Sequence, residues 1–413
     1  MMNTAKPAAD PARRKAVQLS LLCAAVYFCS YLTRHNFAAV MVVITRDGFS
    51  EQLLAAALTG MSITYGAGQL ISGYLGDKLP AYLLIFGGLL VCAAMNLLIP
   101  LCPSAGWMVA VWSMNGLAQA MMWPPLVKVM SMHLHEQDYK RAVVWVSWGG
   151  SVGTIAVYLL APVLISLGGW RPVFIVAAGV AAAMAILWRL CYQRLAMPII
   201  APAPKKQMDA QGKGGALRTL APVMGLIMLA IVLHGSLRDG ITSWTPTYLS
   251  NIYHVDASLS ILSSVVLPLF AIGCHEVTLI LNRRLIKNEM ALAAVIFLAG
   301  LAALGALTLI GSASFPLTVL ALAVSVGSMH GVNLILTCLI PPYLARYGRT
   351  SFVSGLLNSC TYVGAALSTS GIAVLKEQFG WHTTLLVWCL IALAGTLCCA
   401  AVVRKWQRIR EQD

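Results

Sequence analysis

The stretch Tyr27-Phe-Cys-Ser-Tyr-Leu-Thr-Arg34-His-Asn-Phe-Ala-Ala-Val-Met41 decides the fold, because a single arginine interrupts a run that is otherwise apolar. The residues on both sides of it, 17–32 and 37–44, are apolar enough to lie in a bilayer. An arginine at the centre of a membrane helix costs roughly 2.5–3.5 kcal/mol to insert. No acidic residue lies in the stretch to neutralise Arg34, so the pattern predicts a membrane helix whose charge meets an anion.

The rest of the chain has the composition of a membrane protein. Of its 413 residues, 59% are hydrophobic and 10% are charged, whereas a soluble domain has about 25% charged residues. Apolar runs of about 20 residues recur from end to end, and each is long enough to cross the hydrocarbon core. Because lipid offers the backbone no hydrogen-bond partners, such runs must be helices. We predict twelve helices, at residues 17–44, 53–75, 81–101, 106–131, 141–167, 172–193, 219–249, 257–281, 289–311, 315–345, 350–375 and 382–404.

The net charge of +14 is distributed as in a membrane protein and not as in a nucleic-acid-binding protein. Basic residues gather at the two termini and in alternate loops, whereas the opposite loops hold only Arg46, Arg171 and Lys376. An excess of Lys and Arg marks the cytoplasmic loops. We therefore predict that both termini and the central loop are cytoplasmic, that the chain is surrounded by lipid bilayer, and that it binds no nucleic acid.

The sequence indicates neither metal nor enzyme chemistry. Its 11 cysteines lie mostly inside apolar runs, with no CxxC pair and no histidines clustered along the chain. Such cysteines are typical of small buried residues and not of a metal site or a disulfide framework. The sequence also lacks a nucleophile–base set and a phosphate-binding glycine loop. We expect no metal, no cofactor and no enzymatic activity.

The chain is built from two similar halves. Residues 194–218 are the longest polar segment rich in proline and glycine, and they predict a cytoplasmic linker between bundles at 1–193 and 219–413. Val152-Gly153 recurs as Val363-Gly364, and Gly169-Trp170 recurs as Gly380-Trp381 at the same spacing. Parallel six-helix repeats describe the major facilitator architecture. We predict an all-α membrane protein with twelve transmembrane helices in two pseudo-symmetric six-helix bundles, working by rocker-switch alternating access.

Several motifs resemble the organophosphate:phosphate antiporter family of the major facilitator superfamily, which includes glycerol-3-phosphate and hexose-phosphate transporters. They are Tyr31-Leu-Thr-Arg-His-Asn-Phe, Gly48-Phe-Ser, Ser62-Ile-Thr-Tyr-Gly, Trp123-Pro-Pro and Arg238-Asp-Gly-Ile-Thr-Ser-Trp-Thr-Pro-Thr-Tyr-Leu. The resemblance extends in order over nearly the whole chain. It implies a cell (inner) membrane protein that exchanges a phosphorylated small metabolite for inorganic phosphate. A monomer is the default expectation.

The resemblance also implies a substrate site. Arg34 and Arg238 fall on the two arginines that bind the phosphate group in that family, one on the first helix and one on the seventh. Tyr27 and Tyr31 fall on tyrosines of the first helix, and their spacing places them on the face of Arg34. The further implied contacts are Gln119 in the fourth helix, His330 in the tenth and Tyr362 in the eleventh. Guanidinium forks match the oxygens of phosphate or carboxylate.

Three departures from the family pattern leave the substrate open. Gln69, which we keep as a candidate substrate contact, stands where the family has a lysine, Gly150 where it has a histidine, and Ser243 where it has an aspartate. The pocket is therefore less basic than the family's. The two arginines indicate an anion, which is a phosphate ester by resemblance, with a phosphonate or a carboxylate as alternatives.

Other charged residues in apolar runs are candidates for gating or coupling. Asp77, in Gly73-Tyr-Leu-Gly-Asp-Lys78, resembles the superfamily's loop signature and predicts a gating element. Glu276 and Asp239 are candidates for coupling, because a carboxylate inside a membrane is a functional hypothesis by default. Adjacent helical residues diverge by about 100°, so we expect Arg238 and Asp239 to be poorly placed to neutralise each other.

Histidines add two further candidates. His275 precedes Glu276 inside an apolar run, and His234 lies one turn before Arg238. A pH-dependent neighbour of the arginine is one interpretation of His234, and a packed, uncharged histidine is the other.

Three hypotheses for the function stay open at this point. The first is the exchanger, and the second is a proton- or sodium-coupled symporter of an organic anion, coupled through Glu276 or Asp239. The third is a membrane sensor of a phosphorylated metabolite that resembles a transporter, because the resembling family contains such a sensor.

Overall fold

The computed structural model describes residues 11–195, 198–199, 210–255, 263, 266–310, 313–343 and 350–411. Within these ranges every regular element is a helix, and no strand occurs. The first half holds α1 (Pro11–Arg46), α2 (Glu51–Lys78), α3 (Ala81–Leu98), η1 (Ile99–Leu101), α4 (Ala105–Ala120), α5 (Trp123–His133), α6 (Glu136–Gly168) and α7 (Arg171–Leu195). The second half holds α8 (Ala210–Tyr253), α10 (Val266–Arg284), α11 (Glu289–Ile310), α12 (Phe315–Asn333), η2 (Leu334–Leu339) and α13 (Thr350–Glu411).

The helices confirm the predicted all-α membrane fold. Among the described residues, nine helical stretches are long and apolar enough to cross a membrane, in α1, α3, α6, α7, α8, α10, α11, α12 and the second part of α13. The other three predicted helices correspond to α2, to the α4–α5 pair and to the first part of α13. Each of the twelve predicted helices therefore has a helical counterpart among the described residues.

Proline changes two of the predicted boundaries. The helix predicted at 106–131 is two helices, because Pro124 and Pro125 occupy the first turn of α5, where proline is favoured. The helix predicted at 315–345 turns into a π-helix at Leu334–Leu339, just before Pro341 and Pro342. These prolines lack the N–H groups that would bond to carbonyls one turn earlier. The two helices predicted at 350–375 and 382–404 are present as the two parts of α13, which are separated by a kink at Gly380, where φ is 76° and ψ is 178°.

The described residues belong to two compact units, which are considered separately. One unit comprises Met1–Met61 and Leu79–Pro202, and the other comprises Ser62–Lys78 and Ala203–Asp413. The helix α2 thus contributes its first part to one unit and its second part to the other. The predicted bundles at 1–193 and 219–413 and the linker at 194–218 stay predictions, and much of that linker lies outside the described residues.

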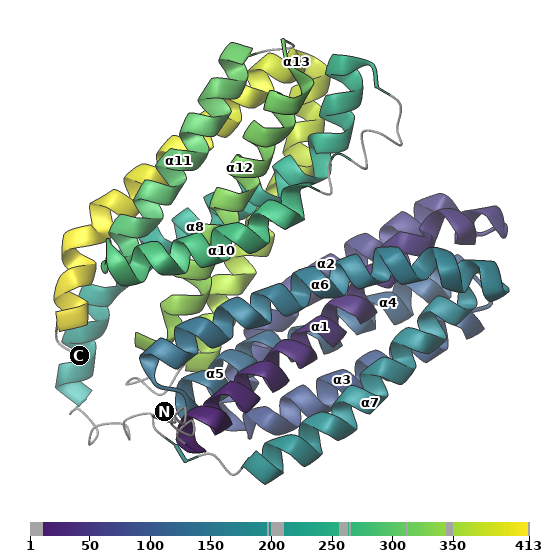
Figure 1. Ribbon diagram of the computed structural model, residues 1–413, viewed down its shortest axis with the longest axis horizontal. Coiled ribbons are helices and arrows are strands. Elements are labelled where there is room, and N and C mark those ends of the chain that lie inside the picture. The colour runs from purple at the N-terminus through teal and green to yellow at the C-terminus, as the bar shows by residue number, and fades with distance from the viewer. Residues whose placement is uncertain are drawn as a thin grey trace, which may run out of the picture. The chain divides into compact units, whose positions relative to one another are not determined.

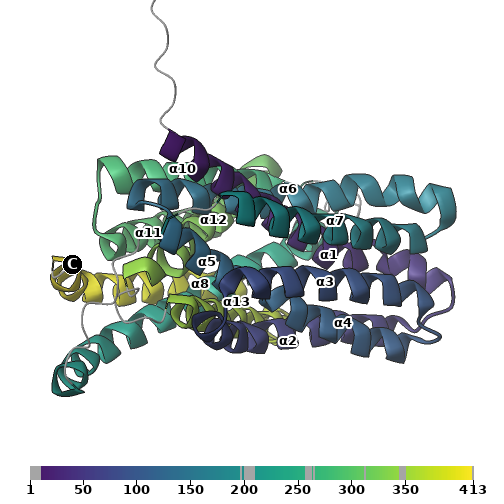
Figure 2. The same cartoon turned by 90° about the horizontal axis from the view of Figure 1, so that it is seen from below.

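In the first unit, α1 packs along α6 and α7, and α3 packs along α7 and α4 (Figures 1 and 2). Close contact of α1 with α6 depends on Gly149 of α6, where a Cβ atom would lie 2.4 Å from the Ala24 carbonyl oxygen. Aromatic rings fill the core at the far end of α1, where the rings of Phe37 and Trp112 are 4.9 Å apart. This packing sets which face of α1 is covered and which carries Arg34.

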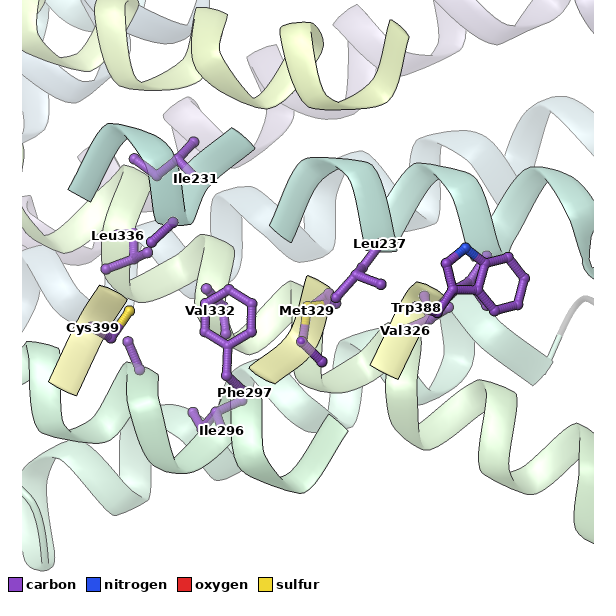
Figure 3. Close-up of a cluster of buried hydrophobic side chains, with 14 of the residues drawn as sticks. Ile231, Leu237, Ile296, Phe297, Val326, Met329, Val332, Leu336, Trp388 and Cys399 are labelled. Carbon is purple, nitrogen blue, oxygen red and sulfur yellow. The ribbon is translucent and has the colours of Figure 1, made fainter. Parts of the chain in front are cut away.

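In the second unit, α8 packs along α13, α11 packs against α12 and α13, and α10 packs against α12. Apolar side chains from several helices meet in its core, and Figure 3 shows part of this cluster. They include Ile231 and Leu237 of α8, Phe297 of α11, Val332 of α12, Leu336 of η2 and Trp388 of α13. Since Leu237 directly precedes Arg238, this core anchors the segment of α8 that carries the second arginine.

Candidate functional site

On α1, the structure brings Arg34 together with the two predicted tyrosines. The guanidinium carbon of Arg34 lies 5.7 Å from the centre of the Tyr31 ring. The Tyr31 ring lies 4.9 Å from the ring of Tyr27 and 5.3 Å from that of His35. All four side chains are partly buried. A cation beside an aromatic face is stabilised by the ring quadrupole, so the tyrosines form a platform beside this arginine.

The glycine at position 150 leaves room for this platform. A Cβ atom on Gly150 would lie 3.1 Å from the Tyr31 ring and 3.2 Å from the Tyr27 ring. The two rings therefore rest against the backbone of α6. In this chain the two tyrosine rings thus take the space that a side chain at position 150 would need.

The predicted substrate contact Gln119 is buried and engaged by α1. The Ser30 hydroxyl donates a hydrogen bond of 2.5 Å to its Oε1 atom, and its Nε2 atom donates a bond of 2.8 Å to the Thr33 Oγ1 atom. Only 1% of the Gln119 surface is exposed. In this structure the amide therefore joins α4 to α1 on the turn that carries Arg34.

Three asparagines that sequence reasoning missed extend this contact into a buried network. The Asn36 Nδ2 atom donates to Asn96 Oδ1 at 2.7 Å, and the Asn115 Nδ2 atom donates to the Thr33 carbonyl at 3.1 Å. All three asparagine side chains are buried. Hydrogen-bonded amides inside an apolar bundle resist rotation, because each lost bond leaves a buried polar group unpaired. The network thus holds α1 in one orientation against α3 and α4. Amides inside apolar runs were the sequence signal that could have found it.

On α8, Arg238 forms a two-point ion pair with Asp239. The Nε atom lies 2.7 Å from Oδ1, and the Nη2 atom lies 3.0 Å from Oδ2. The expectation that the two residues would be poorly placed to neutralise each other was wrong. Neighbouring side chains leave a helix in directions about 100° apart. The arginine side chain is nevertheless long enough for its guanidinium group to reach the Asp239 carboxylate. The Nε and Nη2 atoms of Arg238 are therefore already bound by a carboxylate.

Histidines from three helices interact electrostatically with Arg238. The rings of His275 on α10 and His330 on α12 meet edge to face at 5.6 Å. His234 on α8 is fully buried one turn before Arg238. Each of the three rings lies within electrostatic range of Arg238. The predicted substrate contact His330 is therefore part of a histidine cluster, which consists of His234, His275 and His330.

The predicted contacts Gln69 and Tyr362 lie where α2 packs against α13. The ring of Tyr362 stands edge-on to that of Tyr65, at 4.7 Å. Gln69 is fully buried, and neither polar atom of its amide has a hydrogen-bond partner among the described residues. A Cβ atom on Gly355 would lie 2.2 Å from the Gln69 carbonyl oxygen, so the two helices touch closely here. In this structure Gln69 is a helix-contact residue.

Asp77 caps the start of α13. Its two carboxylate oxygens accept hydrogen bonds from the backbone N–H groups of Ser351 and Phe352, at 3.0 and 2.9 Å. A negative charge at a helix N-terminus satisfies unpaired donors and interacts favourably with the helix dipole. Asp77 therefore fastens the end of α2 to α13.

The remaining predicted coupling residue, Glu276, is partly exposed on α10 between the buried His275 and the exposed Val277. Among the described residues, no three His, Cys, Asp or Glu side chains are grouped so that they could hold a metal ion.

Comparison with known proteins identifies the family. Residues 23–369 match the Major Facilitator Superfamily. The chain is 25% identical to the glycerol-3-phosphate transporter of Bacillus subtilis, over 85% of this chain and 84% of that protein. It is 22% identical to the membrane sensor protein UhpC of Salmonella typhimurium, over 86% of this chain and 84% of that protein. A match of 27% to a probable hexose phosphate transport protein of Chlamydia muridarum covers 35% of this chain and 32% of that protein.

Solved structures show the same fold. The proton:xylose symporter XylE superposes with a TM-score of 0.74 at 11% identity, covering 95% of this chain and 96% of that one. The Escherichia coli fucose:proton symporter FucP superposes with a TM-score of 0.72 at 12% identity, covering 94% and 99%. The chain belongs to the Major Facilitator Superfamily. It is a helical membrane protein of a transporter family and not an enzyme.

Proposed function

We propose that the protein is a secondary active transporter that exchanges a small organophosphate for inorganic phosphate by rocker-switch alternating access. The observation that carries this proposal is Arg34, a cation inside an apolar helix and beside two tyrosines. The second arginine, Arg238, supports it. The similarity to the glycerol-3-phosphate transporter extends over most of both chains and favours a phosphate ester as substrate.

In this mechanism both arginines bind the anion during the transport cycle. Guanidinium groups donate paired hydrogen bonds that fit the oxygens of a phosphate. The Tyr27 and Tyr31 hydroxyls add neutral donors on the face of Arg34. A ligand shifts a conformational equilibrium only by binding one state better than another, so an anion that both arginines hold stabilises the states in which both can reach it.

The ion pair of Arg238 bears on whether the transporter is an exchanger. Exchange is obligatory when an empty, doubly positive site resists the conformational change. Asp239 pairs with Arg238. The positive charge that would oppose this change is therefore smaller than the charge of two unpaired arginines. The ion pair therefore strengthens the alternative function, which is a proton- or sodium-coupled symporter of an organic anion.

Counterflow in proteoliposomes separates these two candidates. Vesicles loaded with inorganic phosphate and offered radiolabelled glycerol-3-phosphate or glucose-6-phosphate are expected to take up label, and empty vesicles are not. Uptake into empty vesicles that follows an imposed pH or sodium gradient would favour the symporter. No phosphate-driven uptake of any organophosphate would overturn the exchange proposal.

A membrane sensor is the second candidate class, because the UhpC sensor resembles this chain over most of both lengths. A sensor needs the same anion site but no flux. Measured net or exchange flux in vesicles favours the transporter. Ligand-dependent thermal stabilisation with no flux under any gradient favours the sensor.

We also propose the setting in which the transporter works. It lies in the cell (inner) membrane as a monomer with both termini cytoplasmic, as the distribution of basic residues indicates. Asp77 acts as a gating element, through its bonds to the start of α13. Labelling of single cysteines placed at Arg14 and Asp47 tests the orientation, because only the second is expected to react from outside the cell.

A further inference from the structure

The far end of α13 has no role in the proposed exchange, although it is built with care. Past the kink at Gly380, α13 continues to Glu411. Crossing a hydrocarbon core of about 30 Å takes about 20 helical residues, so a helix that enters the membrane at the kink leaves the core at about residue 401. The end of α13, residues 404–410, therefore lies at the level of the lipid headgroups.

This end of α13 and the loop before α11 together expose positive charge. The Arg410 Nη1 atom donates a hydrogen bond to the Lys287 carbonyl, so the loop lies beside the end of the helix, as Figure 1 also shows for α11 and the yellow end of α13. Within residues 285–288 and 404–410, all of which the structure describes, no side chain is acidic. We call the exposed basic side chains of these segments the basic surface, which consists of Lys287, Arg404, Lys405 and Arg408.

A buried carboxylate underlies the basic surface. Glu289, the first residue of α11, is fully buried. Its Oε1 atom accepts a hydrogen bond of 2.8 Å from the Tyr343 hydroxyl. Its Oε2 atom accepts bonds from Trp406 Nε1 at 3.0 Å and from Arg410 Nη1 at 3.4 Å. A buried charge is tolerated where it is paired and hydrogen-bonded in this way, so Glu289 holds the end of α13 against the start of α11.

The corresponding junction of the first unit uses a backbone group as its acceptor. There the Trp188 Nε1 atom of α7 donates to the Tyr82 carbonyl, at the start of α3, at 2.9 Å. A backbone carbonyl is thus sufficient to fasten a tryptophan of the last helix to the start of the third. In the second unit the carboxylate of Glu289 also pairs with Arg410. It therefore offsets the mutual repulsion of basic side chains that lie close together.

An anionic lipid headgroup has the chemistry and the location that fit the basic surface. Anionic lipids attract basic residues that lie at the membrane surface, and each such residue raises the affinity about fivefold. Lysine and arginine side chains at the end of a membrane helix reach to the interface, where lipid phosphates lie. A soluble anion would gain nothing from a site at this depth, so the placement favours a lipid.

We propose that the basic surface binds the headgroup of an anionic phospholipid, and that Glu289 is the positioning residue that assembles it. By fixing the end of α13, Glu289 orders the basic side chains before the lipid arrives, which lowers the entropy lost on binding. The two explanations of lipid binding differ in sign. A diffuse attraction follows net charge and grows when a negative charge is removed, whereas a site that Glu289 assembles is weakened by the same change.

The first test measures the affinity of the purified full-length protein, in detergent micelles, for fluorescent phosphatidylglycerol. The triple variant Arg404→Gln/Lys405→Gln/Arg408→Gln is expected to bind it about a hundredfold more weakly, at about fivefold for each residue. All three side chains are exposed, so the variant is expected to fold. Fluorescent phosphatidylcholine, which has no net charge, is expected to bind both proteins equally and weakly. Equal wild-type affinity for the two lipids would overturn the proposal.

A matched control removes the same charge from another helix end. Arg13→Gln/Arg14→Gln/Lys15→Gln changes three exposed basic residues at the start of α1, and we expect its affinity for phosphatidylglycerol to stay close to that of the wild type. Equal losses in the two triple variants would mean that the lipid responds only to net charge, which overturns a site at α13.

The second test uses the predicted difference in sign. Glu289→Gln keeps the size of the side chain and removes its negative charge, and we expect about tenfold weaker binding of phosphatidylglycerol, as one charged hydrogen-bond pair is lost. Tighter or unchanged binding would overturn the positioning role. Tyr343→Phe removes one donor to Glu289 without changing the net charge, so it gives the same test if Glu289→Gln fails to fold. It should also weaken binding, and unchanged affinity would contradict the proposal.

A competition experiment distinguishes a lipid headgroup from a soluble anion. Wild-type protein carrying fluorescent phosphatidylglycerol is challenged with unlabelled phosphatidylglycerol or with inorganic phosphate. We expect the unlabelled lipid to displace the label and inorganic phosphate not to displace it. Equal displacement by inorganic phosphate would assign the basic surface to a soluble anion and overturn the lipid proposal. This inference does not depend on which anion is transported, so the vesicle flux experiments can fail without affecting it.

Discussion

Arg34 and Arg238 are both arginines inside apolar helices, but their surroundings differ. Arg34 lies beside the ring of Tyr31 on a helix that buried amides hold in place. Arg238 is held by the carboxylate of Asp239 and interacts electrostatically with three histidines. The first is a cation on a fixed, aromatic support, and the second is a cation whose charge is already balanced by the protein. The two arginines are therefore expected to contribute differently to binding.

The largest expected effect comes from removing either arginine. Arg34→Ala and Arg238→Ala each remove a fork of charged hydrogen bonds, and we expect at least about a hundredfold loss of phosphate affinity. Arg238→Ala should be the worse of the two, because it leaves Asp239 unpaired beside the anion. Phosphate-dependent thermal stabilisation of the purified variants measures both.

The double variant Arg238→Ala/Asp239→Asn tests this explanation by removing both charges. It should bind phosphate better than Arg238→Ala alone, and equal affinities would contradict a competing role for Asp239. Arg46→Ala, at the exposed end of the same helix as Arg34, serves as the control and should keep wild-type binding.

The second-largest change in phosphate affinity is expected when the ion-pair partner of Arg238 is removed. Asp239→Asn removes the competing carboxylate and retains its size, so phosphate should bind about tenfold more tightly, as one charged hydrogen-bond pair no longer has to be displaced. A thermal-shift titration with phosphate measures the change. Glu377→Gln, an exposed carboxylate of α13, should have no such effect, and weaker binding in Asp239→Asn would mean that Asp239 orients Arg238.

A smaller effect is expected from breaking the hydrogen bonds that hold the turn of α1 carrying Arg34. Gln119→Leu removes the hydrogen bonds to Ser30 and Thr33 and leaves buried hydroxyls without this partner, which costs about 1–3 kcal/mol of stability. If the network positions Arg34, phosphate affinity falls as well. Gln137→Leu, at an exposed residue of α6, is the matched control, and unchanged affinity in a folded Gln119→Leu would restrict the network to stability.

The smallest expected effect concerns the tyrosine platform. Gly150→Ala places a methyl group about 0.3 Å too close to the two rings for ordinary contact, and overpacking of this kind costs about 1–3 kcal/mol. The shifted rings should change substrate selectivity more than phosphate affinity, since phosphate alone needs chiefly the arginine. Competition of phosphate esters against labelled phosphate measures this, and an unchanged ranking of the esters would show that the rings do not contact substrate.

Features that depend on neighbours along the chain were predictable from the sequence. Twelve apolar runs, the helical fold and the shared face of Tyr27, Tyr31 and Arg34 follow from composition and from the period of the α-helix. The positions of most helices agree with prediction. Boundaries failed at Pro124-Pro125 and at the π-helix before Pro341, because local backbone geometry there depends on the surrounding packing as well as on residue type.

What only the tertiary structure decided is the partner of each polar side chain. The sequence by itself determined that Arg34 is an arginine inside a membrane helix, with two tyrosines on its face. It did not determine that Arg238 would fold back onto Asp239, that Gln119 would be bound to α1, or that His275 and His330 would meet. Hydropathy and helical spacing are local properties, whereas these contacts depend on how helices far apart in sequence pack and on the reach of long side chains.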